Sequence, residues 1–166
     1  DLDIPYLFEP LLYFDEENNI DHHSYLLKKP IYIRSFYKEF SKEEYQIDII
    51  KIEFPFNEFE VNGFENDSSS LIYSQESCSE IMQECFEDAT TPVVFLSAGM
   101  KFNNFLQSLE IAKSSKINFL GFLCGRSIWQ DSIDIFCKSG EDKFLNWMDE
   151  EGQKRLQKLK NSIINN

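Results

Sequence analysis

The feature that most constrains the fold of this chain is a repeated order of elements, in which four short apolar runs are each followed by a segment with helical spacing. The runs are nearly continuous in apolar residues, as in parallel strands that are buried on both faces. They lie within residues 4–14, 45–56, 91–96 and 116–125. Four strand-then-helix units predict an α/β fold with a parallel sheet. Periodicity alone leaves open whether this is an open doubly wound domain or half of a TIM barrel.

Helical spacing predicts where the covering elements lie. After Pro30, a residue favourable in a first turn, apolar side chains recur at spacings close to three and four as far as Phe40. The polar segment before Pro30 holds His22 and His23 and is predicted to be a solvated loop, because no third metal ligand accompanies them at a suitable spacing. Further helices are predicted at residues 74–86, 102–112, 127–137 and 141–163, the last broken near Gly152.

Composition narrows the class of protein. The 166 residues, 42% of them hydrophobic, suffice for one packed domain, predicted to span residues 1–166. A formal net charge of −13 disfavours nucleic acid as a partner, because phosphates are held mainly by Lys and Arg. No apolar run approaches the roughly 20 residues that span a membrane. The four cysteines show no CxxC pairing, so we expect reduced thiols in the cytoplasm. The chain begins at Asp1 rather than at methionine, which suggests a fragment.

A side chain that can bind a ligand or take part in a reaction lies at or near the carboxyl end of every predicted strand. These side chains are Glu9, Lys51, Ser97 and Arg126. The carboxyl ends of parallel strands converge with the amino termini of the following helices, and α/β proteins build their sites there. We therefore expect the four side chains to lie along one rim.

Lys51 is the most informative of the four, because it is set into an apolar strand between Ile50 and Ile52. Burial disfavours the charged form of a lysine, and the neutral amine is a nucleophile that can form a Schiff base with a carbonyl. The alternative is a lysine that reaches solvent at the strand end or pairs with Glu53. The strand alone does not decide between the two.

Glu9 lies one strand earlier, between Phe8 and Pro10. Desolvation favours the protonated form of a carboxyl group, which suits proton transfer to and from a carbinolamine. Pairing with a neighbouring Lys or Arg is the alternative for this residue.

Two segments with small residues predict an anion site. Ser97, Ala98 and Gly99 follow the third strand, and Gly125 and Arg126 follow the fourth. Small residues let backbone N–H groups approach a phosphate, the next helix amino terminus favours negative charge, and an arginine binds two phosphate oxygens at once. Each motif taken alone also fits ordinary turn glycines and an ion-paired arginine.

The motifs taken together, in their order along the chain, resemble the carboxyl-terminal half of the class I tagatose 1,6-bisphosphate aldolase family, which also contains sulfofructosephosphate aldolases. The resemblance runs from about residue 4 to residue 152. It is carried by the segments "LFEPLLY", "KKP", "EFSKEEYQIDIIKIEFPFN", "VNGF", "TPVVFLSAGM", "NFLGFLCGRSIW" and "WMDEEG".

This resemblance implies a fold and a set of roles. The family folds as a (β/α)₈ TIM barrel, of which this chain would supply about four βα units, strands five to eight. By resemblance, Lys51 forms the Schiff base and Glu9 is the general acid or base. Ser97, Gly99 and Arg126 would bind substrate phosphate. The implied reaction cleaves a ketose bisphosphate into dihydroxyacetone phosphate and an aldehyde, without metal or another cofactor.

The departures from the family pattern define the alternatives. Four strands cannot close a barrel, so we expect a missing amino-terminal half or a second chain to cover the open sheet edges. The segment "SIWQDS" is bulkier and more polar than is usual in the family, which leaves the preferred phosphorylated sugar open. Two other interpretations remain open: a non-catalytic phosphosugar-binding or regulatory relative, and an unrelated doubly wound binding domain.

Overall fold

The computed structural model of the chain describes residues 3–12, 22–65, 71–88 and 90–164. Its sheet has four parallel strands, which are β1 (Leu7–Phe8), β2 (Ile49–Ile52), β3 (Val93–Leu96) and β4 (Gly121–Leu123). The strands pair in sequence order, β1-β2-β3-β4. The predicted α/β class and parallel sheet are therefore confirmed, and no reversal of strand order marks a doubly wound domain within the described residues.

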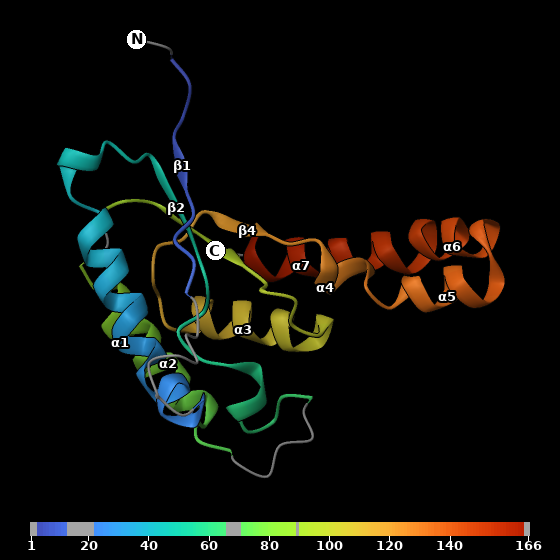
Figure 1. The fold of residues 1–166 in the computed structure, drawn as a ribbon, viewed down its shortest axis with the longest axis horizontal. Helices are drawn as coiled ribbons and strands as arrows, with labels where there is room; N and C mark the ends of the chain where they lie inside the picture. Colours follow the sequence, from blue (N-terminus) through green and yellow to red (C-terminus); the bar gives the residue numbers. More distant parts are fainter. Residues whose placement is uncertain (1–2, 13–21, 66–70, 89, 165–166) are drawn as a thin grey trace.

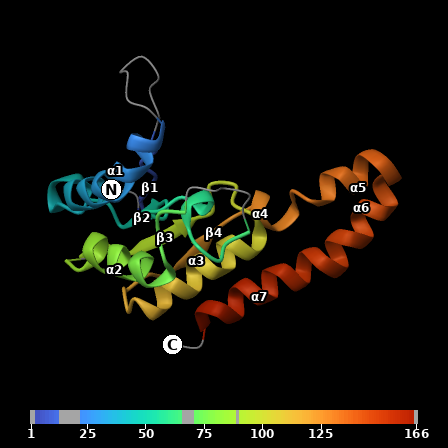
Figure 2. The same ribbon diagram turned by 90° about the horizontal axis from the view of Figure 1, so that it is seen from below.

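A helix follows each strand. The first three are α1 (His22–Phe40), α2 (Gln75–Phe86) and α3 (Phe102–Ser114), and short 3₁₀ turns η2 (Glu43–Tyr45) and η3 (Glu58–Glu60) flank β2. After β4 come α4 (Arg126–Trp129), α5 (Ser132–Ser139), α6 (Glu141–Trp147), the π-helical turn η4 (Met148–Gly152) and α7 (Gln153–Ile164). Figure 1 shows α5 and α6 extending away from the strands. In Figure 2, α7 runs back from α6 beside α3, against which it packs.

Aromatic side chains join the sheet to the first three helices on one face. The ring centroids of Phe8 and Phe40 in α1 are 4.6 Å apart, those of Phe95 and Phe86 in α2 are 5.6 Å apart, and those of Phe122 and Phe105 in α3 are 5.9 Å apart. Such aromatic pairs add to the hydrophobic effect of burial. The first three helices therefore cover the same face of the sheet.

The opposite face carries the side chains that alternate with these. Lys51 is in register with Val94, while its neighbours Ile50 and Ile52 are fully buried in the core cluster. At the outer strands Leu7 and Leu123 remain 41% and 46% exposed. Because successive residues of a strand point to opposite faces, Lys51 lies on the side of the sheet away from the helices.

The predicted elements differ from the observed ones mainly in length. α1 begins at His22, so the predictions that His22 and His23 lie in a loop and that the helix starts after Pro30 were wrong. The rest of that predicted loop, residues 15–21, lies outside the described residues. Pro30 lies inside α1, where proline ordinarily costs about 3 kcal/mol. Buried side chains on both sides of it, Lys29 and Ile33, pack against the rest of the fold, and this tertiary packing overrides the local preference.

The carboxyl-terminal helix also differs from its prediction. We predicted a break near Gly152, but the backbone continues through the π turn η4 into α7 without leaving the helical conformation. Gly152 is buried against Met148 and Trp147. A glycine that packs inside a helix gives the same sequence signal as a glycine that ends one, because both show only the low helix propensity of the residue.

Candidate active site

One pocket of about 500 Å³ lies at the carboxyl ends of the strands. It is lined by Glu9, Lys51, Leu96, Ser97, Ala98, Gly99, Leu123, Cys124, Gly125, Arg126 and Trp129. The structure therefore brings all seven residues proposed from the sequence into one cavity, from four segments of the chain that lie far apart in sequence. Convergence of strand ends in a parallel sheet is the cause.

Lys51 and Glu9 form a direct ion pair within this pocket. Lys51 Nζ donates to Glu9 Oε2 at 2.9 Å, and their side chains are 22% and 36% exposed. Glu53, the other carboxylate considered for Lys51, instead accepts an ion pair from Lys29 of α1 at 2.9 Å. Lys51 thus has the carboxylate of the preceding strand as its partner, and the pairing with Glu53 was wrong.

The contact has a consequence for proton transfer between the two side chains. Both side chains are less buried than the sequence indicated. Glu9 Oε2 lies within hydrogen-bond reach of Lys51 Nζ, so it can take a proton from that nitrogen. The arrangement suits a nucleophile with an adjacent base.

The residues after β3 form a left-handed turn that Arg126 covers. Ala98 and Gly99 have φ values of 50° and 83°, and Met100 N–H donates to the Ser97 carbonyl at 2.9 Å to close the turn. A Cβ placed on Gly99 would lie 3.3 Å from Arg126 Cζ. Glycine at this position therefore avoids backbone strain and leaves room for the close approach of the guanidinium.

Arg126 begins α4, and its guanidinium lines the pocket beside this turn. It forms no ion pair with any residue of the described ranges. Ser127 Oγ donates to the Met100 carbonyl at 2.6 Å and so joins the segment after β4 to the segment after β3. An arginine that is fixed near small residues without a carboxylate partner is suited to an anionic ligand.

A carboxylate of the chain itself lies at the amino terminus of α3. Glu58 Oε2 accepts hydrogen bonds from Lys101 N–H at 3.1 Å and from Asn104 Nδ2 at 2.6 Å. The negative charge at this helix end is therefore a carboxylate of the chain itself. The expected contribution of this terminus to phosphate binding is reduced, and the SAG turn (Ser97, Ala98 and Gly99) with Arg126 remains.

Four residues that line the pocket were not proposed from the sequence. They are Leu96, Leu123, Cys124 and Trp129. Trp129 is the only aromatic side chain among them. It lies three positions after Arg126 on α4, and its Nε1 would be 3.3 Å from a Cβ on Gly125. The i, i+3 spacing from Arg126 was the available signal. Cys124 also lines the pocket, and burial raises the pKa of its thiol to about 11, so it stays protonated at neutral pH and is a poor nucleophile.

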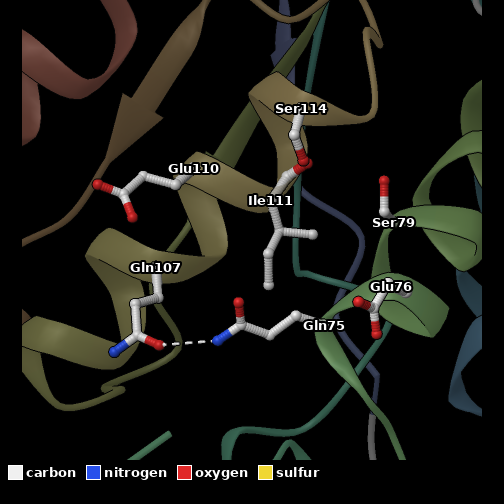
Figure 3. Close-up of a pocket in the computed structure, with 7 residues that line it drawn as sticks. All are labelled: Gln75, Glu76, Ser79, Gln107, Glu110, Ile111 and Ser114. Atoms are coloured by element: carbon white, nitrogen blue, oxygen red, sulfur yellow. Dashed lines mark hydrogen bonds between the residues drawn. The ribbon is translucent and has the colours of Figure 1, made fainter. Parts of the chain in front are cut away.

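A second pocket, of about 640 Å³, lies between α2 and α3 in the helix layer and is shown in Figure 3. Gln75, Ser79, Gln107 and Ser114 are among its lining side chains, and Gln75 Nε2 donates weakly to Gln107 Oε1 at 3.4 Å. Its lining holds no cation and no strand end. The smaller pocket is therefore the better candidate for chemistry on a phosphorylated substrate.

The described ranges contain neither a cluster of metal-ligating side chains nor a membrane-spanning helix. No group of three or more His, Cys, Asp or Glu side chains there is arranged to hold a metal ion. None of the helices in those ranges is both long and apolar enough to cross a membrane.

Comparison with known proteins places the chain in a family. Residues 1–131 match the model of the DeoC/LacD family aldolases. The chain is 33% identical over 159 residues to tagatose 1,6-diphosphate aldolase 1 of Enterococcus faecalis strain ATCC 700802 / V583, with 95% of the chain and 47% of the relative covered. It is 30% identical over 158 residues to tagatose 1,6-diphosphate aldolase of Listeria monocytogenes serotype 4a strain HCC23, with 95% of the chain and 46% of the relative covered.

The chain thus spans about half the length of the curated relatives that it matches. The family match covers both segments of the ion pair, the SAG turn and Arg126. The chain belongs to the DeoC/LacD aldolase family.

Proposed function

We propose that this chain supplies the Schiff-base half of a class I aldolase, a lyase that cleaves a ketose bisphosphate such as tagatose 1,6-bisphosphate into dihydroxyacetone phosphate and an aldehyde. The observation that carries the proposal is the 2.9 Å contact between Lys51 Nζ and Glu9 Oε2, in a pocket that also holds Arg126. Membership of an aldolase family supports it.

In the proposed reaction Lys51 is the nucleophile and Glu9 moves the protons. The Lys51 ammonium gives a proton to Glu9, and the neutral amine adds to the ketone carbon of the substrate. Glu9 then returns the proton to the carbinolamine hydroxyl, water leaves, and an iminium ion remains. General acid–base assistance of this kind typically contributes about 10²- to 10⁴-fold in rate.

Carbon–carbon cleavage follows from the iminium. Glu9, now a carboxylate, takes the proton from the hydroxyl beside the bond that breaks, so the leaving fragment becomes an aldehyde. The electron pair of the broken bond moves into the iminium and gives an enamine. Glu9 protonates the enamine carbon, and hydrolysis of the imine releases dihydroxyacetone phosphate and regenerates the Lys51 amine.

The SAG turn and Arg126 would hold a phosphate of the substrate. Arg126 offers paired N–H donors, Ser97 offers a hydroxyl group, and the small residues Ala98, Gly99 and Gly125 allow backbone groups to approach. Fixing the phosphate orients the ketone toward Lys51, and orientation of this kind accounts for a large part of enzymatic rate enhancement.

We further propose that the described sheet is half of a TIM barrel, completed by four more βα units that precede it in the same chain or belong to a second chain. The exposed Leu7 and Leu123 on the outer strands support this, because an apolar side chain on an unpaired sheet edge favours association with further strands. A cytoplasmic location remains a prediction.

A non-catalytic phosphosugar-binding relative is the second candidate, because the chain spans only about half of its relatives' length and the anion site could persist without turnover. A cleavage assay separates the two. The protein at its full natural length should produce dihydroxyacetone phosphate from tagatose 1,6-bisphosphate in the presence of a chelator, and Lys51→Arg should not. Binding of the bisphosphate with no product from the wild-type protein would support the non-catalytic relative instead.

A further inference from the structure

The helix that carries Arg126 and Trp129 into the pocket is too short to hold itself in place. α4 has four residues, a single turn. A helix of this length is unstable on its own, because a single turn makes few of the backbone hydrogen bonds that stabilise longer helices. Its position must therefore come from contacts with other elements. Ser127 Oγ provides one, through the Met100 carbonyl after β3.

Arg155 of α7 provides further contacts, in addition to the packing of Ile128 against the hydrophobic core. Its Nη1 donates to the Ile128 carbonyl of α4 at 3.1 Å, and its Nη2 donates to Asp131 Oδ2, just after α4, at 2.7 Å. Its Nε donates to Glu151 Oε1 in η4 at 3.3 Å. The Arg155 side chain is only 14% exposed, so these charge-assisted hydrogen bonds are partly shielded from water.

Two aromatic rings fix the guanidinium further. Arg155 Cζ lies 5.0 Å from the ring centroid of Phe102, the first residue of α3, and 5.0 Å from that of Trp147 at the end of α6. Contacts of this kind are attractive by the cation–π effect. One side chain therefore touches α3, which follows the SAG turn, and α4, which begins with Arg126. Arg155 does not itself line the strand-end pocket.

We propose that Arg155 is a positioning residue for the phosphate site. It fixes α4 relative to the start of α3, so that the Arg126 guanidinium is held against Gly99 before the substrate arrives. It does this through the Ile128 carbonyl and Asp131 and without contact to the substrate. The inference rests on the proposed function for the identity of the substrate, but the anchoring contacts exist independently of it. Arg155 also lies beyond residues 1–131, the part that the family model matches.

The test uses the protein at its full natural length with Arg155→Met, and Arg34→Met as the matched control. Arg34 makes an exposed ion pair with Glu87, and neither residue lines the strand-end pocket. Binding of inorganic phosphate is titrated by calorimetry. Borohydride trapping is then compared for dihydroxyacetone phosphate and for dihydroxyacetone, which lacks the phosphate.

Arg155→Met should weaken phosphate binding about tenfold, because misplacing a positioning group by about 1 Å is enough for such losses. It should also remove the preference for dihydroxyacetone phosphate, while dihydroxyacetone is trapped at close to the wild-type rate. Arg34→Met should change neither measurement. Unchanged phosphate affinity in Arg155→Met would overturn the inference, and so would an equal slowing of trapping with both ketones.

Two outcomes keep the proposals distinguishable. If the wild-type protein forms no adduct with either ketone, the proposed function fails, and the phosphate titration still decides the role of Arg155. If Arg155→Met does not fold, Arg155→Lys and Asp131→Ala replace it, since each removes only part of the contact set. Each should weaken phosphate binding by about threefold to tenfold, and wild-type affinity in both variants would overturn the role of Arg155.

Discussion

Replacing Gly99 by alanine should separate the two demands on this position. Gly99 has a φ of 83°, and a Cβ there would lie 3.3 Å from Arg126 Cζ. The left-handed conformation costs a non-glycine residue about 1–2 kcal/mol. The contact itself adds little to the loss of folding stability, because the far end of the arginine side chain can move away. We expect Gly99→Ala to lower the free energy of unfolding by about 1–2 kcal/mol.

The effect on ligand binding should be larger than the effect on stability suggests. The displaced guanidinium would lose at least one hydrogen bond to a bound phosphate, and a hydrogen bond to a charged group contributes about 1.5–3 kcal/mol. That energy corresponds to a loss of affinity of about 10-fold to 150-fold. Urea denaturation measures the stability, and calorimetric titration with inorganic phosphate measures the affinity.

Gly140→Ala is the matched control for this prediction. Gly140 lies between α5 and α6 with a φ of 82°, and a Cβ there would meet nothing within 4 Å. It should lose about 1–3 kcal/mol of stability through its backbone conformation and keep wild-type phosphate affinity. The reasoning would be refuted if Gly99→Ala bound phosphate as tightly as the wild-type protein, or if Gly140→Ala lost affinity to the same degree.

Three further changes test other parts of the account. Glu9→Gln should slow turnover by about 10²- to 10⁴-fold and leave phosphate affinity unchanged, and equal losses in both would argue against a proton-transfer role. Lys29→Met should lower the free energy of unfolding by about 3 kcal/mol, because it leaves Glu53 without its partner in an ion pair whose side chains are only 8% and 16% exposed. A loss of less than about 1 kcal/mol in urea denaturation would contradict this. Burial raises the pKa of the Cys78 and Cys85 thiols from 9.0 to about 12, so the unfolded chain loses these protons first. The free energy of unfolding measured by urea denaturation should therefore hold below pH 9 and fall between pH 9 and 12, by about 1.4 kcal/mol per thiol at pH 10, with a smaller fall when both are replaced by alanine.

The sequence predicted the order of the sheet and most of the lining of the pocket because both follow from local signals. Apolar runs mark the strands, and reactive or small residues at their carboxyl ends mark the rim. The same local signals placed the start of α1 wrongly, because a proline in the first turn and a proline inside a packed helix look alike. Pro30 is the second kind, and only the burial of Ile33 and Lys29 shows it.

Long-range side-chain contacts could not be predicted from the sequence, for a different reason. Glu58 binds the amino terminus of α3 from 43 positions before Lys101, and Arg155 reaches the Ile128 carbonyl from 27 positions away. Neither contact produces a regular spacing of residue types along the sequence from which it could be predicted. The partner of Lys51 was likewise ambiguous, because Glu53 is near in sequence and Glu9 is near in space.

Trapping the Schiff base tests the central claim most directly. The protein at its full natural length is incubated with dihydroxyacetone phosphate and borohydride, which reduces an imine to a stable amine, and the modified residue is found by peptide mass spectrometry. The account predicts one adduct, on Lys51, that disappears in Lys51→Arg because a guanidinium stays protonated and does not attack the carbonyl. It also predicts that Lys101→Arg, a matched change on the surface, keeps the adduct. A folded protein that binds dihydroxyacetone phosphate yet carries no adduct on Lys51 would contradict the account.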